Sequence, residues 1–269
     1  MSNFKFKKQY GQNFLSDKNL LSAIVKDADV NGETSVLEIG PGRAALTVEL
    51  AKVAKNVVSV EIDETLREDI QTAISGFGNI RVVFDDILKL DDDAIDGLFP
   101  GRYSVVANIP YYITTPILFK FLEHSANIDC ITLMVQKEVA ERICAESGSK
   151  DYGVLSIMSR FYSEPRIARV VSKKMFYPMP KVDSAVVCLK IRKGIDYVFA
   201  GKLHKIVQSS FSMRRKTLVN NLMAGFNMSR NDAEQVVKNI GFDVNVRAEK
   251  LGVTDFTNLV QELEDRKTI

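Results

Sequence analysis

Short apolar runs alternate with amphipathic stretches through the first two thirds of this 269-residue chain. A short apolar run is typical of a buried strand, and a longer amphipathic stretch is typical of a surface helix. Strands and helices that alternate at this spacing form a parallel sheet with helices on both faces, so the sequence predicts an α/β fold. The predicted strands are residues 35–39, 56–62, 80–84, 103–107 and 130–136, and the predicted helices lie near residues 44–54, 64–75 and 115–124.

The last third of the chain has a different pattern. DSAVVCLKI (183–191) predicts one more strand, late and antiparallel, and from about residue 195 onward the apolar spacing is helical. We therefore predict a sheet domain over residues 1–193 and a small all-helical domain over residues 194–269. The predicted N-caps in the helical domain are Ser229 and Thr254, and the predicted helix ends are Gly225 and Gly241.

Composition narrows the class of protein. No apolar run approaches the roughly 20 residues of a membrane helix, and MSNFKFKKQYGQNF at the start has no apolar signal segment. We expect a cytoplasmic protein with no membrane partner. Cys130, Cys144 and Cys188, with two histidines, have neither disulfide nor metal-site spacing, so we expect free thiols and no metal.

The net charge is only +2, but the basic residues are unevenly distributed. Residues 191–269 carry 13 Lys and Arg against 9 Asp and Glu, and Arg214, Arg215 and Lys216 form the strongest cluster. Such a cluster fits phosphate contacts with a polyanion. The alternatives are a solvated face or a basic interdomain helix that is paired with acids.

A glycine-rich turn follows the first predicted strand. In EIGPGRAALTVEL (38–50), Gly40, Gly42 and Ala45 match G-x-G-x-x-A, and Glu61 ends the second strand, 21 positions after Gly40. This is where a dinucleotide fold places the acid that binds a ribose. Glycine allows the sharp turn and the close approach of a ligand. The pattern predicts an adenosine-containing ligand.

Glu38 bears on which ligand this is. Its negative charge, two residues before Gly40, would face the pyrophosphate of NAD, whereas a phosphate group prefers positive potential. S-adenosylmethionine has a sulfonium, an ammonium and no phosphate, so the acid favours it. The alternative is that Glu38 is a surface acid that merely solvates the loop.

The carboxyl ends of adjacent parallel strands open onto one crevice. We therefore expect Gly40, Glu61, Asp86 and Asn108 to line the same cleft, where Asp86 could accept a hydrogen bond from an adenine amino group. Either Asp86 or its neighbour Asp85 is expected to serve only as a helix cap or turn former.

NIPYYITTP (108–116) follows the fourth predicted strand. The side-chain oxygen of Asn108 and the carbonyl of Ile109 could accept hydrogen bonds from an aromatic amine and aim its nitrogen at a sulfonium carbon. Pro110 would hold that carbonyl in place, and Tyr111 offers a face on which an extruded base can stack. The alternative is a rigid turn with two half-buried tyrosines.

Together these motifs resemble the ribosomal RNA adenine N6,N6-dimethyltransferases, specifically the bacterial small-subunit (16S) type. This resemblance implies a Rossmann-like S-adenosylmethionine-dependent methyltransferase sheet with a small all-helical C-terminal domain. It covers nearly the whole chain. The matching segments are GQNFL (11–15), VLEIGPGRAALT (36–47), VEID (60–63), DILK (86–89), NIPYYITTPI (108–117), FYPMPKVDSAVV (176–187) and FSMRRKTLVNNL (211–222).

The resemblance also implies individual roles. Tyr111 and Phe176 would sandwich the target adenine; by residue type alone, Phe176 reads as a core aromatic and GQNFL as a loop. The cofactor contacts would be Asn13 and Leu15 from the N-terminal segment, Gly40 at its amino-acid part, Glu61 at its ribose, Asp86 at its adenine, and Asn108 between cofactor and target amine.

The implied substrate is a pair of adjacent adenosines in the 3′-terminal helix loop of 16S rRNA, each methylated twice within the assembling 30S subunit. Separately from the resemblance, we expect a monomer. A related branch methylates one 23S rRNA adenosine and confers antibiotic resistance; RRKTLVNNL and TTPI favour the small-subunit branch. Two other classes stay open. The first is a NAD-dependent oxidoreductase, but the sequence shows no evident set of residues for hydride transfer. The second is a non-enzymatic assembly or transcription factor, and the Asn108–Tyr111 turn argues against it.

Overall fold

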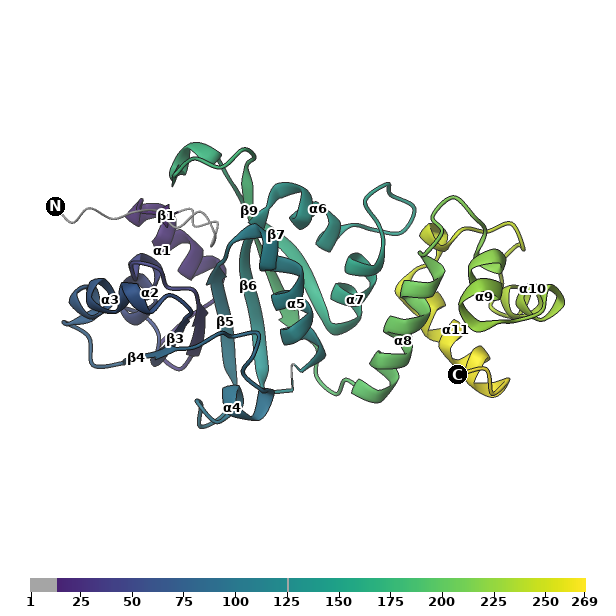
Figure 1. Ribbon diagram of the computed structural model, residues 1–269, viewed down its shortest axis with the longest axis horizontal. Coiled ribbons are helices and arrows are strands. Elements are labelled where there is room, and N and C mark those ends of the chain that lie inside the picture. The colour runs from purple at the N-terminus through teal and green to yellow at the C-terminus, as the bar shows by residue number, and fades with distance from the viewer. Residues whose placement is uncertain (1–13, 125) are drawn as a thin grey trace. The chain divides into compact units, whose positions relative to one another are not determined.

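The computed structural model describes residues 14–124 and 126–269 (Figure 1). They form two compact units. The first contains the chain up to Ala140 together with Glu164–Ile191, and the second contains Glu141–Ser163 together with Arg192–Ile269. The segment Glu141–Ser163 thus joins the helical unit, although it precedes the boundary predicted near residue 193. The division into functional domains at that boundary stays a prediction.

A seven-stranded sheet organises the described part of the first unit, in the order β4-β3-β2-β5-β6-β9-β7. The first five strands in this order run parallel to one another, and β9 runs antiparallel to β6. The predicted α/β fold and the late antiparallel strand are confirmed. The strands are β2 (Ser35–Ile39), β3 (Asn56–Glu61), β4 (Ile80–Phe84), β5 (Tyr103–Asn108), β6 (Ile128–Gln136), β7 (Ser163–Val171) and β9 (Ser184–Ile191).

Helices cover both faces of this sheet. All five residues of β2 are buried, as a central parallel strand requires. Figure 1 shows α1 and α2 on one side of the strands and α5 on the other. The helical elements of this part of the chain are α1 (Lys18–Asp27), α2 (Ala45–Ala51), η2 (Glu64–Leu66), α3 (Arg67–Ile74), α4 (Asp92–Asp96), η3 (Tyr111–Ile113), α5 (Thr114–Glu123) and α6 (Lys137–Cys144).

The largest apolar cluster in the first unit forms because α1 and α2 place leucine and isoleucine against valines of the sheet. Each side chain of this size contributes roughly 1.5–3 kcal/mol when fully buried. Its members include Leu21 and Ile24 from α1, Leu46 and Leu50 from α2, and Val36, Val57 and Val106 from three strands.

A short second sheet joins two distant segments. β1 (Phe14–Leu15) pairs antiparallel with β8 (Phe176–Tyr177), so that Phe14 lies opposite Tyr177. β8 follows η4 (Lys173–Met175) in the connection between β7 and β9. The end of GQNFL therefore lies beside FYPMP, although sequence reading by residue type gave it as a loop.

The described part of the second unit is helical after residue 195, as predicted. Its described helices are α7 (Val154–Tyr162), α8 (Tyr197–Ser210), α9 (Leu218–Phe226), α10 (Arg230–Asn239), η5 (Ala248–Lys250) and α11 (Val253–Asp265). Ser229 caps α10, and Gly241 follows that helix with φ of +86°, so both predictions are confirmed. In the part of the chain that is described, no helix has the length and apolarity to cross a membrane.

Two predicted helix signals are wrong. Gly225 lies inside α9, which ends at the left-handed Asn227; a Cβ at Gly225 would lie 1.7 Å from Ser209 Oγ on α8, so close helix packing explains this glycine. Thr254 is not an N-cap, because α11 begins one residue earlier. The N-cap is Gly252, whose N–H donates to Asp255 Oδ2 at 2.8 Å.

Candidate active site

A cavity of about 730 Å³ opens where β2, β3, β4 and β5 end, within the first unit. Gly40, Glu61, Asp86 and Asn108 all line it, so the predicted convergence at the carboxyl ends of the strands is confirmed. The volume falls in the range of small-molecule and cofactor pockets. Other predicted site residues in the lining are Leu15, Glu38, Gly42, Ile109, Pro110 and Tyr111.

The glycine turn has the backbone conformation that its sequence indicates. Gly40 and Gly42 have φ of +66° and +57°. A Cβ at Gly42 would lie 3.1 Å from the ring of Phe14, whereas a Cβ at Gly40 would meet no atom of the described residues within 4 Å. Both the left-handed φ of Gly42 and the close approach of Phe14 in β1 therefore favour glycine there, and Gly40 leaves open space beside the cavity.

Glu61 holds this turn in place. Its Oε2 accepts the N–H of Gly42 at 3.0 Å, and its Oε1 accepts the N–H of Asp63 at 2.9 Å. Burial raises the pKa of Glu61 in spite of these bonds. Each carboxylate oxygen has a further lone pair, so Glu61 can fix the turn and still accept a hydrogen bond from a ligand hydroxyl.

Glu38 is buried, so the alternative that it is a surface acid is wrong. Only 1% of the residue is exposed, and its Oε2 accepts hydrogen bonds from Thr47 Oγ1 and Ser59 Oγ, each at 2.6 Å. Desolvation by burial raises the pKa of Glu38 to about 7. Glu38 is thus partly protonated near neutral pH. Because its negative charge is then only partial, Glu38 alone is a weaker reason to exclude a pyrophosphate ligand.

The cavity as a whole still disfavours a phosphate group. Its lining includes the carboxylates of Glu61, Asp85 and Asp86 in addition to Glu38. Arg43 is the basic residue in the described lining, and its guanidinium lies 3.4 Å from Asp69. An acidic pocket of this kind suits a cationic ligand better than a pyrophosphate.

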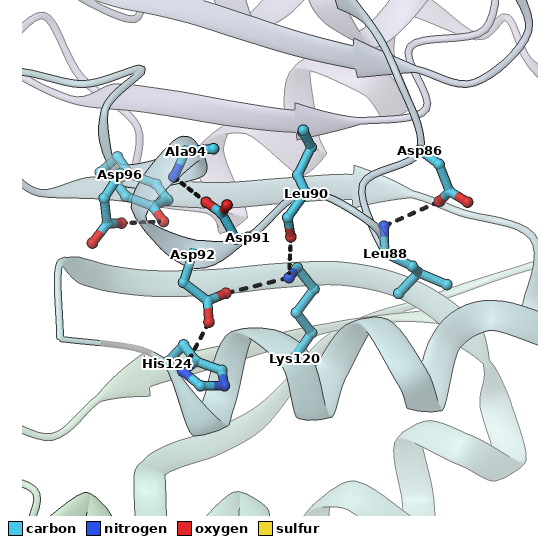
Figure 2. Close-up of polar contacts among 10 residues, drawn as sticks. Asp86, Leu88, Leu90, Asp91, Asp92, Ala94, Asp96, Lys120 and His124 are labelled. Atoms are coloured by element: carbon cyan, nitrogen blue, oxygen red, sulfur yellow. Dashed lines mark hydrogen bonds and ion pairs between the residues drawn. The ribbon is translucent and has the colours of Figure 1, made fainter.

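Asp85 and Asp86 shape the turn after β4. Asp85 Oδ1 accepts the N–H of Asp86 at 2.7 Å, and Asp86 Oδ1 accepts the N–H of Leu88 at 3.1 Å. Figure 2 shows the second of these bonds. Both aspartates are therefore turn formers, and both also line the cavity.

Lys120 on α5 fixes the segment that follows this turn. Its Nζ donates to the carbonyl of Leu90 at 2.7 Å and lies 3.2 Å from Asp92 Oδ1, as Figure 2 shows. The Lys120 side chain is only 15% exposed, so solvent screens this ion pair less than one on the open surface. Lys120 thus ties the Asp86 loop to the helix that follows NIPYY. The sequence reading missed this residue.

Asn108 to Tyr111, in the NIPYY turn, line the same cavity as the acidic loops. Asn108 is the half-buried last residue of β5, and no described residue is recorded as a hydrogen-bond partner of its carboxamide. Tyr111 begins η3; its hydroxyl shares a hydrogen bond of 2.7 Å with Ser184 Oγ, and burial raises the pKa of Tyr111. The alternative of a rigid turn predicted two half-buried tyrosines. Only Tyr111 fits this description, because Tyr112 is 63% exposed.

Phe176 does not line the cavity. It is 5% exposed and packs in the apolar cluster with Leu15 and Val171, as a core aromatic does. Its neighbour Tyr177 lines the cavity and is 72% exposed. The structure does not bring Phe176 and Tyr111 to one face of the cavity, and the implied sandwich stays a prediction. Sequence reasoning missed Tyr177, which only the pairing of β8 with β1 identifies as the outward residue.

The remaining predicted site residues lie elsewhere. Asn13 falls outside the described residues. Arg214, Arg215 and Lys216 are exposed in the second unit, where Arg214 donates to the carbonyls of Lys150 at 3.0 Å and Tyr152 at 3.4 Å. Residues 14–124 and 126–269 contain no group of three or more acidic, His or Cys side chains that could hold a metal ion.

Comparison with known proteins gives consistent matches over nearly the whole chain. The family model for ribosomal RNA adenine dimethylase matches residues 3–265. Ribosomal RNA small subunit methyltransferase A of Listeria innocua is 42% identical over 276 residues, which cover 97% of this chain and 92% of that protein. The Bacillus thuringiensis protein of the same name is 40% identical, with the same coverage.

Two solved structures share the fold. A dimethyladenosine transferase from Plasmodium falciparum superposes with a TM-score of 0.81 at 27% identity, covering 94% of this chain and 98% of that one. The 23S rRNA methyltransferase ErmE superposes with a TM-score of 0.71 at 28% identity, covering 94% of this chain and 100% of that one.

Proposed function

The chain belongs to the ribosomal RNA adenine dimethylase family, and on that premise we propose that it methylates N6 of two adjacent adenosines in the 3′-terminal helix loop of 16S rRNA. Each adenosine receives two methyl groups from S-adenosylmethionine. The observation that carries this proposal is that the glycine turn and the Asn108–Tyr111 turn line one cavity. Relatives with 40–42% identity are named small subunit methyltransferases, which supports the small subunit as substrate over 23S rRNA.

The cavity fits S-adenosylmethionine, whose sulfonium supplies a reactive methyl group. Gly40 leaves room for the amino-acid part, and Glu61 can accept hydrogen bonds from the ribose hydroxyls. Asp86 would accept from the adenine amino group, and Leu15 would pack beside the cofactor. Gly42 holds the turn, the partly protonated Glu38 belongs to the acidic lining of the pocket, and Asn13 would contribute from outside the described residues.

Asn108 and Ile109 would prepare the target amine. The lone pair of adenine N6 is delocalised into the ring, so the amine is a poor nucleophile. In the first transfer, hydrogen bonds from its two N–H groups to the Asn108 Oδ1 and the Ile109 carbonyl favour a pyramidal nitrogen that is aimed at the methyl group. Pro110 restricts the backbone that carries this carbonyl.

No strong general base is required for the transfer. Once N6 has accepted the methyl group it is positively charged and acidic, and it loses its proton to water or to a weak acceptor. Tyr111 offers its ring face to the extruded base. Phe176 would complete a sandwich only if its ring left the apolar cluster, which is a conformational requirement of that role.

Arg214, Arg215 and Lys216 would contact rRNA phosphates and supply affinity that falls with salt. Base identity would be read at unstacked loop nucleotides. The protein would act as a monomer on the assembling 30S subunit in the cytoplasm.

The test is incubation with labelled S-adenosylmethionine and unmethylated small or large ribosomal subunits, followed by mapping of the modified nucleotides. The proposal expects two dimethylated, adjacent adenosines in 16S rRNA. Label on a single 23S rRNA adenosine would assign the chain to the resistance branch. RNA binding without transfer of label would indicate an assembly factor. Binding of NADH instead of S-adenosylmethionine would contradict the proposed cofactor.

A further inference from the structure

The connection between β7 and β9, Ser172–Asp183, carries much of the exposed apolar surface in the first unit. We call these 12 residues the projecting segment; Figure 1 draws it in green beside β1. Among the described residues, 12 large apolar side chains are exposed, and four of them lie in this segment: Met175, Tyr177, Met179 and Val182. A concentration of this kind marks a contact surface, because scattered single residues are the norm elsewhere.

The base of the projecting segment is anchored to the rest of the first unit. Phe176 is buried in the apolar cluster, and the next residue, Tyr177, therefore points to the opposite side of β8. Asp183 Oδ1 accepts the N–H of Lys173 at 2.9 Å, and the Asp183 carbonyl accepts the N–H of Lys137 at 3.0 Å. Tyr177 thus lies at the rim of the cavity with 72% of its surface exposed.

The charge of the projecting segment is basic. It contains Lys173, Lys174 and Lys181 against the single acid Asp183. In residues 14–124 and 126–269, none of these lysines is recorded in an ion pair with a carboxylate; Lys173 Nζ lies 3.4 Å from the carbonyl of Lys181. Cations beside exposed aromatic rings are the combination that binds single-stranded nucleic acid, through phosphate contacts and base stacking.

The cavity beside the segment has the opposite sign. Its lining includes Glu61, Asp85 and Asp86, so a phosphate group is disfavoured inside it and favoured beside the lysines. Tyr112, from η3, is a second exposed aromatic residue in the lining. This separation lets a neutral base enter the cavity while the strand that carries it stays on the basic rim.

We propose that the projecting segment is the docking surface for the unpaired RNA strand that flanks the target adenosine. The base next to the target stacks on Tyr177, and Lys174 and Lys181 contact the phosphates of the same strand. Tyr177 is a positioning residue, since it acts on a neighbouring nucleotide and not on the reacting amine. The inference rests on the proposed function and adds how this chain holds the strand outside the cavity.

The first experiment compares Tyr177→Ala with Tyr177→Phe in methyl transfer to unmethylated small subunits. Loss of a base–aromatic stack raises KM between about fivefold and about a hundredfold, so Tyr177→Ala should raise KM within this range. Tyr177→Phe keeps the ring and should stay within about twofold of wild type. Val53→Ala, which truncates an exposed apolar residue before the amino end of β3, is the matched control and should change nothing.

Cofactor binding separates positioning from damage to the cavity. Calorimetry with S-adenosylmethionine and no RNA should give the same Kd for Tyr177→Ala and wild type. A loss of cofactor affinity as large as the rise in KM would overturn the proposal, because Tyr177 would then act on the cavity itself. An unchanged KM would also overturn it, provided that the wild-type enzyme is active.

A second measurement tests the lysines and the identity of the partner. Binding of a single-stranded oligoribonucleotide that spans the two target adenosines is measured against salt concentration. Replacing both Lys174 and Lys181 with Gln should reduce the slope of log K against log salt by about 0.7 for each lost phosphate contact. Lys55→Gln, at the amino end of β3, is the control and should keep the wild-type slope.

The docking proposal and the proposed function can fail separately in these experiments. If Tyr177→Ala weakens only the reaction with subunits and leaves oligoribonucleotide binding intact, the segment contacts a ribosomal protein and the proposal is wrong. If wild-type protein transfers no methyl group to 16S rRNA, the proposed function fails before any variant is compared.

Discussion

The hydroxyl of Tyr111 lies 2.7 Å from Ser184 Oγ, although the two residues are 73 positions apart. Tyr111 belongs to NIPYYITTPI, and Ser184 is the first residue of β9, within FYPMPKVDSAVV. This bond joins the two most specific motifs of the chain at the wall of the cavity. Its effect is to hold one edge of the Tyr111 ring, so that the position of the ring face is set by β9 as well as by its own turn.

The contact predicts different effects for two substitutions of Tyr111. Tyr111→Phe keeps the ring and removes the hydroxyl. The free energy of unfolding, measured in urea, should therefore fall by about 1 kcal/mol, while the rate of methyl transfer stays within about threefold of wild type. Tyr111→Ala removes the stacking face and should lower kcat/KM by about fivefold to a hundredfold. Equal damage by the two variants would show that the ring has no role in stacking.

Glu38 predicts a specific dependence of stability on pH. Burial raises its pKa from 4.5 to about 7, so the folded protein binds more protons than the unfolded chain between these two values. The contribution of Glu38 to the free energy of unfolding is therefore fully present below pH 4.5 and is lost as pH rises through about 7. At 1.36 kcal/mol per pH unit this amounts to a few kcal/mol, on the order of 3.

Glu38→Gln tests this dependence, because a carboxamide oxygen can still accept from Thr47 and Ser59 and does not titrate. Urea unfolding at a series of pH values should show a flatter curve between pH 4.5 and 7 for the variant than for wild type. If the stability curves of the variant and wild type ran parallel over this pH range, Glu38 would not be the group that causes the pH dependence. Glu49→Gln is a useful contrast, since the hydrogen bond from Lys52 lowers the pKa of Glu49 and its contribution has the opposite pH dependence.

Gly225 predicts a steric cost in the second unit. A Cβ at this position would lie 1.7 Å from Ser209 Oγ and 2.9 Å from Ser209 Cβ, so α8 and α9 would have to separate. Gly225→Ala should lower the free energy of unfolding by about 1–3 kcal/mol.

Two further variants check the cause of that loss. Ser209→Gly in the Gly225→Ala background removes the clashing atoms and should restore part of the stability. Gly201→Ala, in α8 with no atom of residues 14–124 and 126–269 within 4 Å of the added Cβ, should be neutral or stabilising by about 0.5–1 kcal/mol. Equal losses for Gly201→Ala and Gly225→Ala would refute the packing explanation.

Much of the first unit could be predicted because its signals are local and repeat along the chain. The predicted strands match β2, β3, β4, β5, β6 and β9 within two residues. Topology then placed Gly40, Glu61, Asp86 and Asn108 at one edge of the sheet, since parallel strands present their carboxyl ends together. No side-chain packing was needed for that inference.

Features that depend on tertiary contacts could not be predicted. β7 contains Pro165 and alternating charged residues, which its place at the edge of the sheet tolerates but which hide the strand pattern. Gly225 has the residue type of a helix end, yet its position is determined by Ser209 on another helix. Local sequence also cannot decide which of Phe176 and Tyr177 faces inward, because the partner strand β1 decides it.

The most direct test of the account compares Asn108→Ala with wild type in transfer of labelled methyl groups to unmethylated small subunits, with S-adenosylmethionine binding measured in parallel. The account predicts that kcat falls by about a hundredfold or more, because preorganised hydrogen bonds to the reacting amine are lost. It also predicts that the cofactor Kd stays close to wild type. Transfer at a near wild-type rate by Asn108→Ala would contradict the central claim.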